Sequence, residues 1–179
     1  MTSLPQQLII GVTGRRTLAD EGRMAAAIDE ALDRIVKTVA GERATGPAAT
    51  RGKAPLRLVV LSPLAEGADR LVAEHVLARA GAALEAVLPL DRGEYEKDFK
   101  TQRSRSEFRD LLARARAIHE LPRAANREDA YASAGRFVVD HCDVLVAVWD
   151  GRPGDGPGGT AETVAYARKK RRRLLVIEP

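Results

Sequence analysis

The sequence contains little of three things that large classes of proteins need: cysteine, aromatic residues and long apolar runs. One cysteine in 179 residues excludes an internal disulfide and is typical of a reducing compartment. Aromatic residues make up 4% of the chain, so few rings are available to stack on nucleic-acid bases. No apolar run approaches the roughly 20 residues of a membrane span, and no secretory signal is visible. We therefore expect a soluble, cytoplasmic protein with no membrane contact.

The chain also lacks the spacing of a metal site. His75, His119 and His141 are scattered, and the one cysteine, Cys142, has no second ligand near it in the sequence. We therefore predict neither a metal nor another cofactor. Cys142 precedes an apolar run and is expected to lie in the core. His141 lies on the apolar face of a predicted helix and is expected to be packed there.

The composition provides enough apolar residues for a hydrophobic core, together with a small excess of positive charge. Hydrophobic residues make up 45% of the chain, which suits one domain spanning residues 1–179. The net charge of +4 permits anionic ligands without demanding DNA. The basic run Lys169–Arg173 is the best feature for nucleic-acid binding, but a helix C-terminus also favours cations. With few aromatic rings beside it, this run leaves nucleic acid an unlikely partner.

Short apolar segments alternate along the chain with segments of helical periodicity. Strands are predicted at residues 8–12, 56–61, 83–88, 117–121, 144–149 and 173–177. Helices are predicted at residues 20–40, at a segment ending near residue 80, and at 103–115, 127–140 and about 160–168. This alternation predicts an α/β fold, a Rossmann-like three-layer sandwich with a mostly parallel sheet of about six strands. Residues 41–55, rich in Gly, Pro, Ala and Thr, are predicted to be a flexible insertion.

The most informative stretch is the apolar segment Val144–Trp149 with the glycine-rich loop after it. Residues 151–159 contain five glycines and two prolines, and Gly159 or Thr160 begins the next helix. Such a helix N-terminus binds anions, because its N–H groups and its dipole point at the ligand and glycine allows close approach. The sequence therefore predicts a phosphate-binding loop here.

Two other predicted strands are followed by polar, glycine-containing loops. Thr13–Arg16 combines a glycine with two arginines, and Ser62–Asp69 combines a hydroxyl, two carboxylates and a glycine. The carboxyl ends of parallel strands meet at one edge of a sheet, so we expect these loops and Asp150–Glu162 to converge on one ligand. The predicted binding residues are Gly11, Thr13, Gly14, Arg15, Arg16, Ser62, Glu66, Gly67, Asp69, Gly158, Gly159 and Thr160.

Four blocks of the sequence together resemble a known superfamily. They are GVTGRR (Gly11–Arg16), SPLAEGADRLVAEH (Ser62–His75), AVLPLDRGEYEKDF (Ala86–Phe99) and CDVLVAVWDG…GGTAETVAYAR (Cys142–Arg168). This set resembles the SLOG superfamily of Rossmann-like domains, which are related to the DNA-processing A protein and to the LOG phosphoribohydrolases. The resemblance implies binding of nucleotides or nucleotide-derived ligands, in some members as sensors in bacterial conflict systems, and it suggests a homodimer.

The resemblance also includes enzymes that cleave N-glycosidic bonds. LOG enzymes and nucleoside deoxyribosyltransferases have a Gly-Thr loop with a glutamate that is similar to Gly158–Glu162. By this resemblance Glu162 would be the catalytic carboxylate, with Asp150 or Asp98 as a proton carrier. The loop is shorter here than in LOG enzymes, and the helix before it lacks their contiguous Glu-Arg-Lys.

Three functions therefore stand as hypotheses. The first is binding of a nucleotide-derived small molecule, with phosphate on the two glycine loops and sugar hydroxyls on Asp69 and Glu162. The second is an N-glycosidic hydrolase or transferase that uses Glu162. The third is a nucleic-acid-binding module.

Overall fold

The computed structural model describes residues 6–45, 56–153 and 158–179. Six parallel strands form one sheet in the order β4-β3-β2-β1-β5-β6. The strands are β1 (Gln6–Gly14), β2 (Leu56–Ser62), β3 (Ala83–Leu88), β4 (Ala117–Glu120), β5 (Val144–Val148) and β6 (Arg173–Ile177). The helices are α1 (Glu21–Thr45), α2 (Ala68–Leu77), α3 (Arg92–Glu96), α4 (Gln102–Arg114), α5 (Arg127–His141) and α6 (Thr160–Lys169). The predicted α/β fold with a parallel sheet is confirmed.

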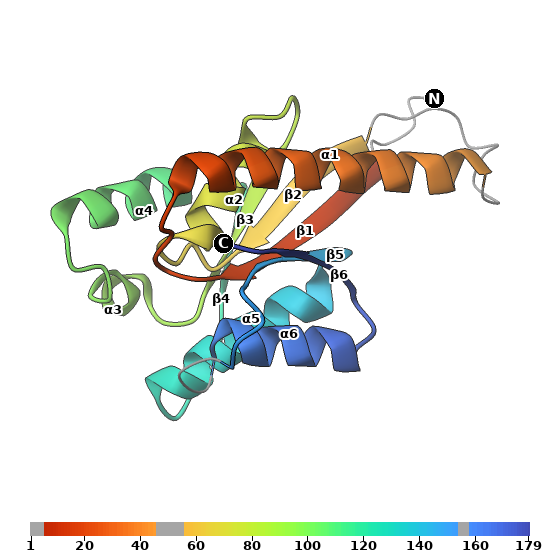
Figure 1. Ribbon diagram of the computed structural model, residues 1–179. Coiled ribbons are helices and arrows are strands. Elements are labelled where there is room, and N and C mark those ends of the chain that lie inside the picture. The colour runs from red at the N-terminus through yellow and green to blue at the C-terminus, as the bar shows by residue number, and fades with distance from the viewer. Residues whose placement is uncertain (1–5, 46–55, 154–157) are drawn as a thin grey trace, which may run out of the picture.

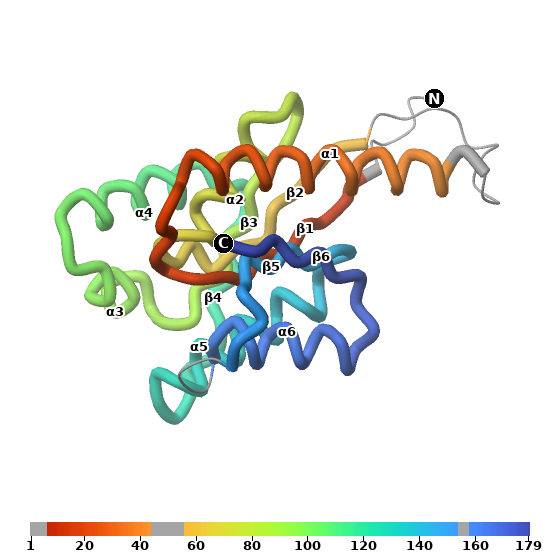
Figure 2. The backbone as a smooth tube through the Cα atoms, viewed as in Figure 1, coloured from red at the N-terminus to blue at the C-terminus, as the bar shows by residue number. Residues whose placement is uncertain are grey.

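Helices cover both faces of the sheet, which gives three layers (Figures 1 and 2). The alternation of side chains along β1 decides which residue meets which layer. Ile10 and Val12 are buried in one cluster with residues of α1 and α2. On the opposite face a second cluster joins Leu61 and Leu145 to α5 and α6 residues such as Val138. Strands buried on both faces explain why the sequence shows continuous apolar runs.

The element boundaries agree closely with the sequence patterns, apart from the ends of β1 and α1 and the short helix α3, which was not predicted. β1 continues to Gly14, because Thr13 and Gly14 pair with Ala147 and Val148 of β5. Helix α1 extends to Thr45, so residues 41–45, predicted to be part of a flexible insertion, are helical. The remainder of that predicted insertion, residues 46–55, lies outside the described residues.

The two side chains predicted to be packed at the end of α5 have different surroundings. Cys142 is buried, as expected, and burial raises the pKa of its thiol to about 11. His141 is exposed; its ring stacks on Phe137, and its Nδ1 lies 2.8 Å from the Phe137 carbonyl oxygen. The prediction that His141 is packed in the apolar face was therefore wrong. Among the described residues, no helix combines the length and apolarity needed to cross a membrane.

Candidate functional site

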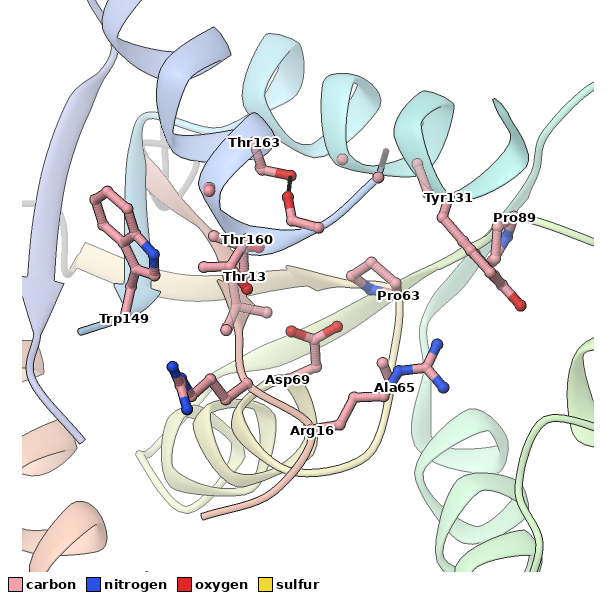
Figure 3. A pocket seen from close by; sticks show the side chains of 18 of the residues that line it. Thr13, Arg16, Pro63, Ala65, Asp69, Pro89, Tyr131, Trp149, Thr160 and Thr163 are labelled. Atoms are coloured by element: carbon pink, nitrogen blue, oxygen red, sulfur yellow. Dashed lines mark hydrogen bonds between the residues drawn. The ribbon is translucent and has the colours of Figure 1, made fainter. Parts of the chain in front are cut away.

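A cleft of about 680 Å³ lies at the carboxyl ends of the strands. The strand order places β2, β3 and β4 on one side of β1 and places β5 and β6 on the other. The crevice between β1 and β5 is therefore the point where the order of strands reverses, the usual ligand site of open α/β sheets. Residues from all three predicted loops line this cleft, together with residues of α5 (Figure 3). The predicted convergence of the loops is observed.

The two glycines of β1 serve packing. A Cβ at Gly11 would lie 2.7 Å from Cγ1 of Val138 on α5, and Gly11 does not line the cleft. A Cβ at Gly14 would lie 2.4 Å from Cβ of Ala68 and 2.9 Å from Cβ of Val148. Gly14 does line the cleft, and its small size brings the start of α2 against the end of β1.

Arg15 and Arg16 differ in their partners, although both line the cleft. Arg15 forms an ion pair with Asp150, so its charge is already matched by a carboxylate. The Arg16 guanidinium lies over the Tyr131 ring, 5.7 Å from the ring centroid. No carboxylate among the described residues lies within ion-pair distance of Arg16. Arg152 also lines the cleft and shares Asp150 with Arg15, at 3.6 Å. Arg16 is therefore the arginine of this cleft whose charge is not paired with a carboxylate of the described residues.

The backbone at the start of α2 positions this arginine. Gly67 has φ +78°, and a Cβ there would lie 2.3 Å from the Arg16 carbonyl oxygen. The Ala68 N–H donates to the Arg15 carbonyl oxygen at 3.0 Å. Because Gly67 has no side chain, the backbone of Arg15 and Arg16 can pack directly against it. Gly67 itself does not line the cleft.

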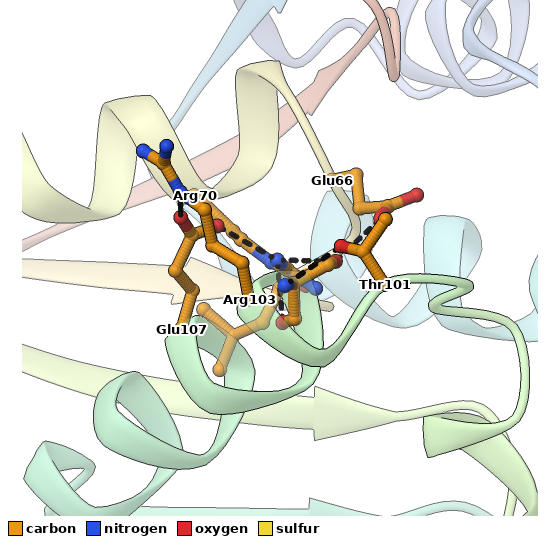
Figure 4. A network of polar contacts seen from close by, with 7 residues as sticks. Glu66, Arg70, Thr101, Arg103 and Glu107 are labelled. Atoms are coloured by element: carbon orange, nitrogen blue, oxygen red, sulfur yellow. Dashed lines mark hydrogen bonds and ion pairs between the residues drawn. The ribbon is translucent and has the colours of Figure 1, made fainter.

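Ser62 and Glu66, two further predicted binding residues, point away from the cleft. Ser62 is fully buried; its hydroxyl accepts the Leu64 N–H at 3.0 Å and donates to the Asp69 carbonyl at 3.3 Å. Glu66 accepts a hydrogen bond from the Ser104 hydroxyl on α4 (Figure 4). Both residues shape the loop between β2 and α2.

Glu66 belongs to a polar network around the buried guanidinium of Arg70 (Figure 4). Arg70 donates to the Leu64 carbonyl at 3.0 Å and to the carbonyl and hydroxyl of Ser104, both at 2.9 Å. The guanidinium also lies 4.4 Å from the Phe99 ring centroid. Burial lowers the pKa of Arg70, and the nearby carboxylates Glu66 and Glu107 oppose this effect. The network ties α2 to α4 and is structural.

Asp69 has a different environment from its neighbours, because its carboxylate lines the cleft. The residue is 6% exposed, and burial raises the pKa of the carboxyl from 3.8 to about 7, against the opposing effects of the Ala65 N–H, Arg16 and Arg70. Among the described residues, Ala65 is the one hydrogen-bond donor to this carboxylate. Figure 3 shows the side chain directed into the cavity.

The glycine-rich loop leads into the cleft at the N-terminus of α6, where Gly158, Gly159 and Thr160 all line it. Gly158 has φ +77°, and a Cβ there would lie 2.8 Å from Cβ of Tyr131. Gly159 is the N-cap of α6 and offers no side-chain cap. The first N–H groups of a helix have no acceptor within the helix, so this end can receive an anion. Part of the predicted loop, residues 154–157, lies outside the described residues.

The two predicted catalytic carboxylates are both engaged in the protein. Glu162 is absent from the cleft lining; it accepts the Gly158 N–H at 2.6 Å and pairs with Arg136 at 3.0 Å. The Gly158 N–H and the Arg136 guanidinium lower the pKa of Glu162, although partial burial opposes them. Asp150 lines the cleft; desolvation raises its pKa, but the Arg152 N–H and the Arg15 guanidinium lower it overall. Both carboxylates are therefore kept ionised, and neither is suited to donate a proton near neutral pH.

Two tyrosines that the sequence analysis did not assign as binding residues also line the cleft, together with Trp149 after the end of β5. These are Tyr131 on α5 and Tyr95 on α3. The Tyr131 hydroxyl donates to Asp98, which also pairs with Arg127 at 2.9 Å. Tyr131 lies four residues before Gly135, which also lines the cleft, so the two share one face of α5. This four-residue spacing is the feature of the sequence from which Tyr131 could have been placed at the cleft.

No group of three or more potential metal ligands occurs within residues 6–45, 56–153 and 158–179. The fold and the cleft together define a Rossmann-like α/β domain whose cleft, at the switch in strand order, is lined by arginines and by the N-terminus of α6.

Comparison with known proteins supports this class. No protein-family model matches the chain, and no curated protein matches it. The structure is similar to that of DNA processing protein A from Helicobacter pylori, solved for insight into its single-stranded DNA binding mode. The TM-score is 0.58 at 15% identity, and the match covers 96% of this chain and 66% of that chain. The match shows that the two chains share the Rossmann-like α/β fold that the sequence predicted.

This similarity corrects one expectation. The neighbour is a single-stranded DNA-binding protein, which contradicts the expectation that nucleic acid is an unlikely partner. That expectation rested on the low aromatic content, which limits base stacking. Phosphate contacts from arginine and lysine supply much of the affinity for nucleic acids, so a scarcity of rings does not exclude binding.

Proposed function

We propose that the chain binds a nucleotide or a nucleotide-derived small molecule in the cleft between β1 and β5. The observation that supports this most is the combination, in one cleft, of Arg16 without a carboxylate partner and the N-terminus of α6. Arginine and a helix N-terminus are the two features that most commonly hold phosphate in proteins. A volume of about 680 Å³ is within the range of small-molecule sites.

The proposal is for binding without cleavage. An N-glycosidic reaction that uses Glu162 needs this carboxylate at the sugar, but Glu162 is held by Gly158 and Arg136 outside the cleft lining. Binding without a reaction is what a sensor domain requires.

The test is isothermal titration with inorganic phosphate, nucleoside 5′-monophosphates, cyclic nucleotides and NAD, with thermal unfolding and base release followed in parallel. A ligand that binds only the native state raises the unfolding temperature. We expect at least one nucleotide to bind, and we expect Arg16→Gln to weaken it about tenfold or more, because a charge-assisted hydrogen bond is lost.

Arg34→Gln is the matched control, because Arg34 is exposed on α1 and does not line the cleft. Its affinity is expected to equal that of the parent protein. If no probe binds, or if Arg34→Gln weakens binding as much as Arg16→Gln, the cleft is not the site.

Single-stranded DNA is a second candidate ligand, because the structural neighbour is described as binding it. The basic run Lys169–Arg173 adds a surface feature that suits this candidate. Within it Lys170 pairs with Asp140 at 3.3 Å and Arg173 pairs with Glu42 at 2.8 Å. Lys169 and Arg171 are exposed and have no ion pair with any described residue. These two cations are available to a phosphate backbone.

A further inference from the structure

Two carboxylates line the cleft, and they differ in what they can accept. Asp150 is matched by the Arg15 guanidinium and accepts the Arg152 N–H at 3.2 Å. Asp69 has one donor, the Ala65 N–H, although it is 6% exposed. A buried carboxylate is normally paired or fully hydrogen-bonded, because leaving its oxygens without donors is costly. Asp69 is an exception to this rule, and its carboxylate lies in a cavity, where a ligand can supply further hydrogen-bond donors.

The position of Asp69 limits which part of a nucleotide reaches it. In Figure 3 its carboxylate points into the cavity, with Thr160 on one side and Arg16 on the other. Arg16 and the N-terminus of α6 are the elements proposed to hold phosphate, and Arg16 acts electrostatically on Asp69. The donors nearest a nucleotide's phosphate are the hydroxyls of its sugar, and the amino groups of the base lie farther away.

We propose that the Asp69 carboxylate accepts hydrogen bonds from the 2′- and 3′-hydroxyls of the bound nucleotide. A 2′-deoxyribonucleotide keeps the 3′-hydroxyl but lacks the 2′-hydroxyl, so the cleft prefers ribonucleotides. This proposal rests on the proposed function and names its ligand class. A hydrogen bond from a hydroxyl to a carboxylate is stronger than one to a neutral acceptor. A site built for such a donor rejects the analogue that lacks it, because the buried acceptor is then left unpaired.

The groups that face Asp69 keep one state of charge between pH 5.5 and 8.5. They are Arg16 after β1, Arg70 on α2 and Tyr95 on α3. Arginine stays protonated, and burial raises the pKa of Tyr95, so its hydroxyl stays neutral. Asp69 is therefore the group among them that titrates in this interval.

The experiment measures affinities of the four ribonucleoside 5′-monophosphates and their 2′-deoxy counterparts for the full chain at pH 8.5 and pH 5.5. At pH 8.5 we expect the ribonucleotide to bind about tenfold tighter or more. The ratio should approach one at pH 5.5, because the protonated carboxyl accepts hydrogen bonds weakly. Both ligands of a pair carry the same phosphate, so its own titration and its repulsion of Asp69 cancel in the ratio.

Asp69→Asn should bring the ratio at pH 8.5 to within about twofold. Glu74→Gln is the matched control on the same helix, because Glu74 is exposed and outside the cleft. It should retain the parent ratio. If Asp69→Asn does not fold, the pH dependence of the parent ratio decides.

Each other outcome overturns the inference in a recognisable way. Equal binding of ribo- and deoxyribonucleotides at pH 8.5 refutes it and leaves the proposed function standing. An Asp69→Asn variant that alters the preference among bases, and not between sugars, assigns the carboxylate to a base amine instead. Absence of binding by the monophosphates, the cyclic nucleotides and NAD alike refutes the proposed function as well.

Discussion

At the scale of the residue, the buried carboxyl group of Asp69 lowers the stability of the folded protein near neutral pH. Asp69 is 6% exposed, and burial raises its pKa from 3.8 to about 7. The folded protein therefore holds a proton on Asp69 that the unfolded chain releases between about pH 4 and pH 7. Stability falls as the pH rises through this interval and levels off above about pH 7. Such a cost is common where a site is kept for a ligand.

Asp69→Asn is expected to stabilise the protein at pH 8 and to have little effect at pH 4. The difference between the two pKa values of Asp69 corresponds to at most about 4 kcal/mol. Urea unfolding of both proteins at several pH values, followed by circular dichroism, measures this difference. An identical dependence of stability on pH in the two proteins would show that Asp69 does not titrate as described.

At the scale of the element, contacts between loops set the start of α2. The Gly67 backbone touches the loop after β1, and its positive φ is unfavourable for any side chain. Gly67→Ala combines a strained φ of +78° with a Cβ 2.3 Å from the Arg16 carbonyl oxygen. We expect a loss of about 2 kcal/mol or more in the free energy of unfolding, together with weaker nucleotide binding because Arg16 is displaced.

Gly22→Ala is the comparison for this prediction. Gly22 lies in the first turn of α1, and the nearest atom to a Cβ there is a carboxylate oxygen 3.6 Å away. Alanine should stabilise the helix by roughly 0.5–1 kcal/mol. Chemical denaturation of both variants gives opposite signs if the described geometry holds.

The side chain of Glu162 holds the loop that leads into α6 in place. Its carboxylate accepts the Gly158 N–H at 2.6 Å and pairs with Arg136. Glu162→Gln keeps the shape and removes the charge, so we expect a loss of about 0.5–1.5 kcal/mol in the free energy of unfolding. If any nucleotide proves to be cleaved, base release measured by chromatography should persist in this variant. Loss of base release with binding retained would instead make Glu162 the catalytic carboxylate.

At the scale of the whole molecule, the parallel sheet brings together loops that are far apart in the sequence. The ends of β1, β2 and β5 meet at one edge, and α5 and α6 close the cleft from one face. The molecule also carries a net charge of +4, which favours anionic ligands of any size. The dependence of binding on salt therefore separates a small ligand from a nucleic acid.

A nucleotide held in the cleft contacts few cations. A plot of the logarithm of its binding constant against the logarithm of the salt concentration should therefore have a slope no steeper than about −1. A single strand of DNA that crosses several cations should give a slope of about −0.7 per phosphate neutralised. Titration of a nucleoside monophosphate and of an oligodeoxythymidylate between 50 and 300 mM NaCl distinguishes these cases. If the double variant Lys169→Gln with Arg171→Gln reduces only the oligonucleotide slope, the basic run contacts the strand.

Local patterns were sufficient to predict the elements of this fold, except the short helix α3. β3 and β6 have the predicted bounds, and the Asp20 side chain caps α1 by accepting the Arg23 N–H at 2.9 Å. These features depend on residues close in the sequence, such as an apolar run or a capping carboxylate. The edge of the sheet that holds the site was also predictable, because a parallel arrangement places all carboxyl strand ends together.

The tertiary structure alone decided which of the predicted residues face the cleft. Arg15 and Arg16 are adjacent and chemically identical, yet Asp150, 135 residues from Arg15, neutralises one and not the other. Glu66 and Asp69 lie three residues apart in one loop, but the packing of α4 draws Glu66 away and leaves Asp69 in the cavity. Direction and partner are set by segments distant in the sequence, and no local pattern encodes them.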